Sequence, residues 1–328
     1  MVTQPGASMR TRVAGSSRTP RGGSIDVHQH LWPHQLVEAL RARTEPPRLV
    51  GWVLHLDGEP PFEVDPGDHE PAKRAVAEPG DRAAALVSLS APLGIETLRP
   101  DAAQQLLDAW HDGARDLPSP FRAWASVGAV DPDLKGLEAL LANGFVGLQV
   151  PAGDLATPDR LERLVPVLRV CELAGRPVFI HPGPVTRSSS ASEQSQNRLP
   201  GWWAAMVGYP AQMQAAWWSW HVAGRSLLPR LRICFAAEAG LAPVHHERLS
   251  ARGGRLGRLD PDVFVDTSSY GPQALDALIR ALGIDALVLG SDRPYAQPVT
   301  AADLAMGAAA ATAIQITNPH RLLEGGRP

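Results

Sequence analysis

The segment Ile25-Asp26-Val27-His28-Gln29-His30 has the apolar character of a short buried β-strand and ends in two histidines. Side chains two residues apart on a strand point to the same side, so His28 and His30 project together. Two imidazoles placed in this way can clamp one divalent metal ion. Taken alone, the spacing also fits an alternative interpretation, a pair of ordinary polar residues that leave a strand.

Apolar runs of the same kind recur along the chain. They are continuous rather than alternating, which is typical of strands buried on both faces. The eight expected strands cover residues 25–28, 85–89, 123–127, 146–150, 178–181, 232–236, 263–266 and 286–289.

Helical patterns lie between these runs and carry start and stop signals. Thr157-Pro158, for example, has the pattern of an N-cap followed by a first-turn proline, and Gly175 ends that segment. Repeated alternation of strand and helix predicts an α/β fold, a closed (β/α)8 TIM barrel over residues 24–328. An open doubly wound sheet is the alternative, but no GxGxxG fingerprint follows the first strand to support nucleotide binding there.

Three segments stand outside this alternation. Residues 1–23 hold four arginines and no acidic residue, and we expect a disordered basic tail. Residues 44–80 follow the first strand and residues 183–226 follow the fifth, so both inserts should lie as lids on the face where barrel active sites form. Five tryptophans of the second insert favour an aromatic lid or an oligomer contact, with core packing as the alternative: Trp202, Trp203, Trp217, Trp218 and Trp220.

Composition excludes several classes of function. The chain has 31 Lys+Arg against 34 Asp+Glu, so it lacks the excess of basic residues that nucleic acid binding needs. Its two cysteines, Cys171 and Cys234, cannot form a disulfide framework, and we expect a cytoplasmic protein. The Ala-rich stretch of residues 304–319 has no charged side chain but is shorter than the roughly 20 apolar residues of a membrane span, so no membrane association is expected.

Two further strand ends carry side chains that bind metals. His181 ends the fifth expected strand, and Asp292 follows the eighth. The active site of a barrel forms where the carboxyl ends of its strands meet, so both side chains should join His28 and His30. The set supplies three imidazoles and one carboxylate and leaves room for a metal-bound water. The expected partner is a small-molecule substrate.

The segments at these strand ends resemble those of the amidohydrolase superfamily. The closest likeness is to its amidohydrolase-related branch, which holds aminocarboxymuconate-semialdehyde decarboxylase-like decarboxylases and lactone hydrolases. The segments are Asp26-Val-His28-Gln-His30, Val178-Phe-Ile-His181-Pro and Gly290-Ser-Asp292-Arg-Pro-Tyr295. The resemblance implies a barrel with a metal at its mouth, bound by the three histidines and by Asp292, which also handles a proton. The expected cofactor is one divalent ion, Zn²⁺ with Mn²⁺ as the alternative.

The chain departs from the family pattern at two places. Many superfamily members bridge two metals with a carboxylated lysine at the end of strand four, but neither Lys73 nor Lys135 lies near that position, so one ion is expected. The strand-six histidine of this branch is also missing, because Ala237 takes its place and Glu238 follows. We expect Glu238 to cap the following helix or, if the strand end shifts, to enter the site as a catalytic base or ligand.

Three other side chains are candidates for substrate binding. Arg293 and Tyr295 follow the aspartate and are placed to hold a substrate carboxylate. His55, in the first insert, can reach over the mouth of the barrel. The alternatives are a surface arginine, a packing tyrosine and a solvated histidine.

The function expected from these residues is that of a metal-dependent hydrolase for a small carboxylate-bearing lactone, ester or amide. Hydrolysis needs only a metal-activated water and Asp292 as the proton carrier. A non-oxidative decarboxylase of the same branch is the alternative, and it ranks second because its usual strand-six histidine is absent. A catalytically inactive barrel that acts as a binding protein is a further alternative, and a homodimer is left open.

Overall fold

The computed structural model describes residues 22–57, 59–185, 200–257, 259–296 and 306–326. Most of the expected basic tail therefore lies outside the described residues. Eight parallel strands overlap the eight expected runs. They are β1 (Ser24–Gln29), β5 (Arg82–Val87), β6 (Phe121–Ala123), β7 (Leu148–Pro151), β8 (Val178–His181), β9 (Ile233–Phe235), β10 (Val263–Asp266) and β11 (Leu287–Val288).

The eight strands close into a barrel. One sheet has the order β1-β5-β6 and another the order β7-β8-β9-β10-β11. The Val146 amide donates to the Ala123 carbonyl at 3.0 Å, which joins the sheets on one side. On the other side the Val27 amide donates to the Leu289 carbonyl at 2.8 Å. The predicted (β/α)8 barrel is therefore confirmed.

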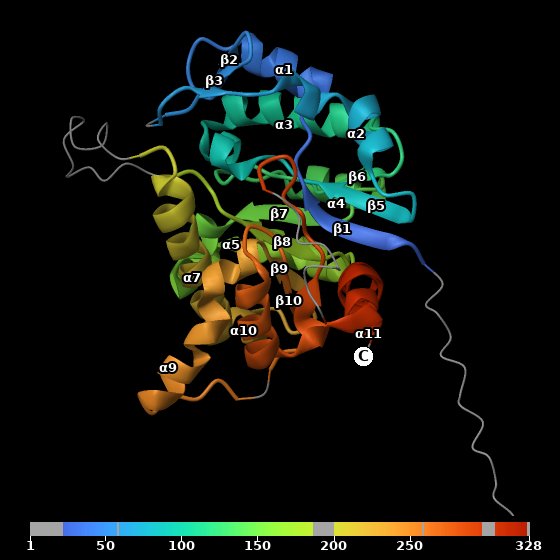
Figure 1. Ribbon diagram of the computed structural model, residues 1–328. Helices are drawn as coiled ribbons and strands as arrows, with labels where there is room; N and C mark the ends of the chain where they lie inside the picture. The colour runs from blue at the N-terminus through green and yellow to red at the C-terminus, as the bar shows by residue number, and fades with distance from the viewer. Residues whose placement is uncertain (1–21, 58, 186–199, 258, 297–305, 327–328) are drawn as a thin grey trace, which may run out of the picture.

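Helices surround the strands, as Figure 1 shows for α3, α4, α5 and α10. The Thr157 hydroxyl accepts the Arg160 amide at 3.3 Å, so α5 begins at the predicted cap. No helix of the described residues is long and apolar enough to cross a membrane. The helices are α1 (His34–Arg41), α2 (Pro71–Ala77), α3 (Pro100–Arg115), α4 (Leu134–Ala142), α5 (Pro158–Leu173), α7 (Tyr209–Ser219), α8 (Arg225–Leu227), α9 (His246–Ala251), α10 (Pro272–Leu282), α11 (Gly307–Thr312) and α12 (Asn318–Glu324).

Aromatic side chains fill the barrel interior below its mouth. The rings of Trp124 and Phe179 stack with centroids 5.2 Å apart, and Phe179 lies edge-on to His28 at 5.0 Å. The Trp124 indole N–H donates to the Val27 carbonyl at 3.0 Å, so its polar atom is satisfied in the core. The end of β1 thus packs against Trp124 and Phe179, and this close packing helps to fix the positions of His28 and His30.

The first insert forms a small antiparallel sheet of β2 (Arg48–Val50), β3 (Val53–His55) and β4 (Phe62–Glu63), followed by α2. It packs against the end of β1, because His69 stacks on Trp32 with ring centroids 4.3 Å apart. The Trp32 amide donates to His69 Nδ1 at 3.0 Å, and Arg74 donates to the His30 carbonyl at 3.1 Å. The insert therefore covers the barrel end that carries the two histidines.

The second insert is largely helical beyond residues 186–199, which lie outside the described residues. A π-helical turn (Ala204–Gly208), α7, a second π-helical turn (Trp220–Gly224) and α8 follow one another. Trp217 and Trp220 are buried, so core packing explains both. Trp202 and Trp203 are exposed, at 58% and 39% of their surface.

The chain leaves β9 through a turn of unusual conformation. Five consecutive residues from Ala237 to Leu241 have φ between 47° and 61°, a region that side chains other than glycine rarely adopt. Gly240 is required there, since a Cβ would lie 2.6 Å from the Pro210 carbonyl of α7. Glu238 makes no capping bond, so the expectation that it caps the next helix is wrong. Its side chain is fully buried instead, and both carboxyl oxygens have no partner among the described residues.

Replacing Gly147 with alanine should destabilise the barrel. A Cβ at this position would lie 2.2 Å from the Pro177 carbonyl and 2.6 Å from the Trp124 ring. Overpacking of this kind typically costs about 1–3 kcal/mol, which a urea titration can measure. Gly153→Ala is the matched control, because nothing lies within 4 Å of its Cβ position. Equal unfolding midpoints for the two variants would contradict this packing.

Replacing Glu238 with glutamine should stabilise the protein at alkaline pH. Burial, reinforced by the Asp266 carboxylate, raises the pKa of Glu238 from 4.5 to about 9. The unfolded chain releases this proton from about pH 4.5 upward while the folded chain keeps it, so the free energy of unfolding falls as pH rises toward 9. The free energy of unfolding of the variant should exceed that of the parent by about 5 kcal/mol at pH 8 and match it near pH 4. Urea unfolding at both pH values measures this difference, and Glu247→Gln, at an exposed position, is the control. If the free energies of unfolding of Glu238→Gln and of the parent changed equally between the two pH values, the prediction would be contradicted.

Candidate metal centre

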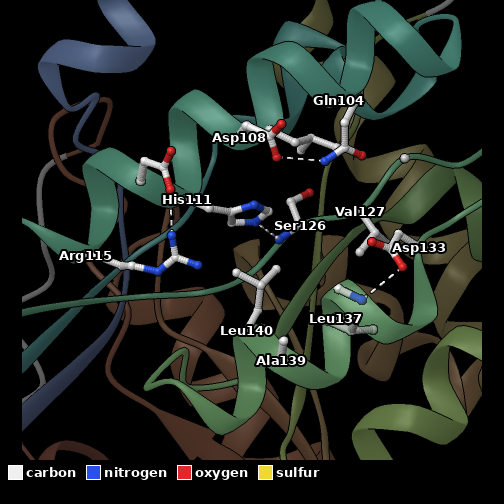
Figure 2. A pocket seen from close by; sticks show the side chains of 14 residues that line it. Gln104, Asp108, His111, Arg115, Ser126, Val127, Asp133, Leu137, Ala139 and Leu140 are labelled. Carbon is white, nitrogen blue, oxygen red and sulfur yellow. Dashed lines mark hydrogen bonds and ion pairs between the residues drawn. The ribbon is translucent and has the colours of Figure 1, made fainter.

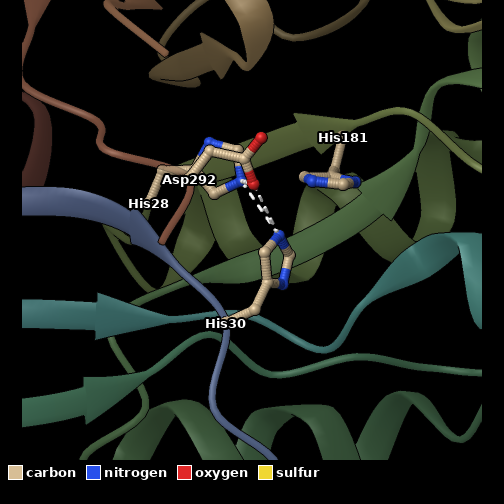
Figure 3. Close-up of side chains that lie close together, drawn as sticks. All are labelled: His28, His30, His181 and Asp292. Carbon is tan, nitrogen blue, oxygen red and sulfur yellow. Dashed lines mark hydrogen bonds and ion pairs between the residues drawn. The ribbon is translucent and has the colours of Figure 1, made fainter. Parts of the chain in front are cut away.

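Four side chains from three separate parts of the chain converge at the mouth of the barrel (Figure 3). His28 and His30 lie at the end of β1, His181 ends β8, and Asp292 follows β11. One ligand atom of each lies within 4.8 Å of those of the others. Asp292 Oδ1 is 3.2 Å from His30 Nε2 and 3.4 Å from His28 Nε2. The structure thus brings together the four residues that the sequence nominates as metal ligands.

Each histidine is held by its other ring nitrogen. His28 Nδ1 donates to Asp266 Oδ2 at 2.6 Å, and His181 Nδ1 donates to the Pro182 carbonyl at 2.8 Å. His30 Nδ1 donates to the Ser88 carbonyl at 3.1 Å. With the proton on Nδ1, each Nε2 carries a lone pair directed to the centre.

These contacts leave acceptors facing one another with no donor between them. The Nε2 atoms of His28 and His30 are only 3.2 Å apart, and Asp292 Oδ1 approaches both. Such a group of acceptors is unfavourable in a buried site unless a cation lies among them. Three imidazole nitrogens and one carboxylate oxygen are a donor set for Zn²⁺ or Mn²⁺, so the residues present fit a single divalent ion.

His30, His181 and Asp292 have the ionisation that this donor set needs, whereas the surroundings of His28 favour its protonated form until a cation takes the place of the proton. Burial lowers the pKa of His30 and of His181, which keeps both rings neutral. Burial also lowers the pKa of His28, but the carboxylates of Asp292 and Asp266 outweigh it and raise that pKa above its ordinary value. Burial acts to raise the pKa of Asp292, yet the neighbouring histidines hold it below its ordinary range. Asp292 is therefore an ionised carboxylate.

The local backbone explains the sequence Gly290-Ser291-Asp292. A Cβ at Gly290 would lie 2.7 Å from Asp266 Oδ2, so only glycine allows Asp266 to reach His28. The Ser291 amide donates to Asp26 Oδ1 at 3.0 Å, and the Asp292 amide donates to the His28 carbonyl at 2.8 Å. Asp292 has φ of 56°, which aspartate tolerates better than most residues.

The other predicted site residues do not join the four ligands. Tyr295 lies beside them, with its ring centroid 5.3 Å from that of His30. Arg293 is paired with Glu78 at 3.6 Å. His55 lies in β3 opposite Arg48 in the insert sheet.

Sequence reasoning missed the residues that orient the ligands. Asp266 closes an expected strand, and its place at a strand end is a signal that could have found it. Ser88 acts through its backbone carbonyl, which leaves no trace in the sequence. Ser90 accepts the Trp32 indole N–H at 3.0 Å and lies 3.2 Å from His30 Nδ1, contacts that depend on the tertiary fold.

A cavity of about 240 Å³ lies elsewhere, between α3 and α4 on the outside of the barrel (Figure 2). Its buried imidazole, His111, accepts the Ser126 amide at 3.2 Å. Arg115 donates to Asp112 at 2.6 Å across its rim. It holds none of the four converging residues and is distinct from the candidate centre.

Among proteins of known function, the chain is similar in sequence to decarboxylases. The chain is 28% identical over 173 residues to the 2-amino-3-carboxymuconate-6-semialdehyde decarboxylase of Dictyostelium discoideum, covering 48% of this chain and 45% of that protein. It thus spans less than half the length of the curated relatives it matches.

Two solved structures share the fold. The 5-carboxyvanillate decarboxylase of Sphingomonas paucimobilis has a TM-score of 0.65 at 18% identity and covers 92% of this chain and 98% of its own. A dihydroxybenzoic acid decarboxylase of Polaromonas, solved with bound manganese, has a TM-score of 0.64 at 17% identity and covers 94% and 98%. At such identities the likeness shows the fold alone.

The expectation of a hydrolase is wrong in the light of these relatives. They are decarboxylases, which was the alternative. Ala237 in place of a histidine therefore does not identify a hydrolase. The family described as Amidohydrolase matches residues 25–324, which is nearly the whole chain. The protein therefore belongs to the amidohydrolase family.

Proposed function

We propose that the protein is a metal-dependent, non-oxidative decarboxylase of a small carboxylic acid. The observation that carries the proposal is the convergence of three imidazole nitrogens and the Asp292 carboxylate at the barrel mouth. The decarboxylases among its relatives support the reaction class. The acid is proposed to carry its carboxylate on an unsaturated or aromatic carbon, as do the acids named for the related decarboxylases.

The residues of the chain have separate tasks in this reaction. His28, His30, His181 and Asp292 would hold the ion, and Asp266 with the Ser88 and Pro182 carbonyls keeps the imidazoles in the binding tautomer. The ion, Mn²⁺ or Zn²⁺, would supply positive charge to bind substrate oxygens and to offset charge that develops during bond cleavage. The manganese in the Polaromonas neighbour supports Mn²⁺ as the first choice.

Asp292 is proposed to carry the proton of the reaction. Cleavage of the carbon–carboxylate bond releases CO₂ and leaves the electron pair on the substrate carbon. Asp292, an ionised carboxylate at rest, relays a proton from water through Oδ2 to that carbon, which forms the new C–H bond; the hydroxide left by the water is neutralised by solvent, and Asp292 ends the cycle as a carboxylate. This oxygen faces away from the imidazoles, since Oδ1 is the atom near both Nε2 groups.

The remaining candidates are proposed to contact the substrate. Tyr295 is placed for this beside His30, with its side chain 46% exposed. Arg293 is half-buried against Glu78 and would present the rest of its guanidinium to a substrate carboxylate. His55 is proposed to act from the insert that covers the mouth.

Removal of a single ligand should abolish stoichiometric metal binding. Protein stripped with a chelator and refilled with Mn²⁺ or Zn²⁺ should hold about one ion per chain by elemental analysis. His181→Ala should bind at least about 100-fold more weakly, because a ligand contributes more than the 10–100-fold of an outer-shell partner. His34→Ala, an exposed histidine of α1, is the matched control. Unchanged affinity in His181→Ala would reject the centre.

The reaction class is tested by following CO₂ release beside lactone and ester opening. A suitable panel contains 5-carboxyvanillate, 2,6-dihydroxybenzoate and related hydroxylated aromatic acids. We expect CO₂ and the decarboxylated product in equal amounts. Asp292→Asn should lower kcat by about 10²–10⁴-fold through loss of the proton carrier. Lactone or ester hydrolysis by the metal-loaded enzyme without CO₂ release would refute the proposal.

A further inference from the structure

One short segment forms hydrogen bonds with two of the four proposed ligands, His28 and Asp292. It is the loop Asp266 to Ser269 at the end of β10, and it contributes no ligand of its own. Asp266 Oδ2 accepts from His28 Nδ1 at 2.6 Å, and the Ser269 hydroxyl donates to Asp292 Oδ2 at 3.0 Å. Four consecutive residues therefore connect β1 to the segment after β11 through the metal centre.

The Ser269 hydroxyl gives the two oxygens of Asp292 different surroundings. Oδ1 lies 3.2 Å from His30 Nε2 and 3.4 Å from His28 Nε2, on the side of the imidazoles. Oδ2 receives the Ser269 hydrogen bond on the other side. Tilting the carboxylate plane about the Cβ–Cγ bond would lengthen the Ser269 hydrogen bond, so the hydroxyl restrains that plane with one oxygen toward the imidazoles and the other toward the loop.

Ser269 has a left-handed backbone conformation that is unusual for a serine. Its φ of 69° lies in the left-handed region, where glycine, asparagine and aspartate are the residues most easily accommodated. A serine there is less favourable for the backbone than glycine would be. The hydroxyl bond to Asp292 is what glycine could not supply.

The loop is held firmly enough to place this hydroxyl. The amide and the hydroxyl of Ser268 both donate to Asp266 Oδ1, at 3.1 Å and 2.8 Å. The Ala237 amide donates to the Ser268 hydroxyl at 3.1 Å, and the Gly290 amide donates to the Thr267 hydroxyl at 3.3 Å. The loop is thus tied to β9 on one side and to the residues before Asp292 on the other.

We propose that Ser269 is a positioning residue of the metal centre. Its hydroxyl orients Asp292 so that Oδ1 alone is offered to the ion and Oδ2 is kept apart for the proton. This inference rests on the proposed function, since it assigns the orientation of the same aspartate.

The test measures Mn²⁺ binding directly, by electron paramagnetic resonance of the free ion during titration of the full chain. Ser269→Ala and Ser269→Gly both remove the hydroxyl, but glycine relieves the backbone while alanine does not. Both should bind Mn²⁺ about 10-fold more weakly than the parent, as expected for loss of an outer-shell bond. Ser269→Asn, which tolerates the conformation and retains a donor, should stay within about 2-fold.

Thermal unfolding of each variant separates folding from binding, and Ser250→Ala on the exposed face of α9 is the matched control. Parental Mn²⁺ affinity in Ser269→Gly would overturn the role of the hydroxyl while leaving the metal centre intact. Parental protein that binds neither Mn²⁺ nor Zn²⁺ would overturn the metal centre and this inference together. Metal binding that depends on Ser269 without CO₂ release from any acid would reject the decarboxylase and support the positioning role.

Discussion

The hydrogen bond between His28 Nδ1 and Asp266 Oδ2, at 2.6 Å, is the contact on which the architecture of the mouth depends. It joins β1 to β10 across the end of β11, which lies between them in the barrel. The bond can pass there only because Gly290 has no side chain, since a Cβ would lie 2.7 Å from the same oxygen. One glycine, one carboxylate and one imidazole thus fix the tautomer of His28 and the position at which Asp292 leaves its strand.

Much of this framework could be predicted from the sequence because it is encoded locally. Buried parallel strands appear as continuous apolar runs, and the histidines and aspartate at their ends belong to the same runs. The partners of those residues could not be predicted in the same way. Asp266 closes a predicted strand, but its bond to His28 depends on which strands become neighbours. The Ser88 carbonyl is a backbone group that any residue would supply.

The prediction for Glu238 failed because the backbone there adopts left-handed φ angles that are rare for residues other than glycine. Glu238 was expected to cap a helix, which requires extended backbone before the first turn. The chain instead runs through five left-handed residues from Ala237 to Leu241, of which Gly240 is the one glycine. That path buries the Glu238 carboxyl with no partner among the described residues, and burial then raises its pKa to about 9. Propensity rules carry no signal for such a turn, in which four of the five residues are not glycine and Gly240 lies close to Pro210 of α7, a neighbour that only the tertiary fold supplies.

The same turn explains why a missing histidine was a poor guide to the reaction. The side chain at position 237 is only a methyl group, but its backbone amide donates to the Ser268 hydroxyl at 3.1 Å. Ser268 in turn donates to Asp266, which orients His28, and the next residue bonds to Asp292. The backbone of position 237 is therefore linked to the candidate metal centre by hydrogen bonds through the loop after β10. The four possible ligands converge without an imidazole at this strand end, so the methyl group of Ala237 leaves the candidate metal centre intact.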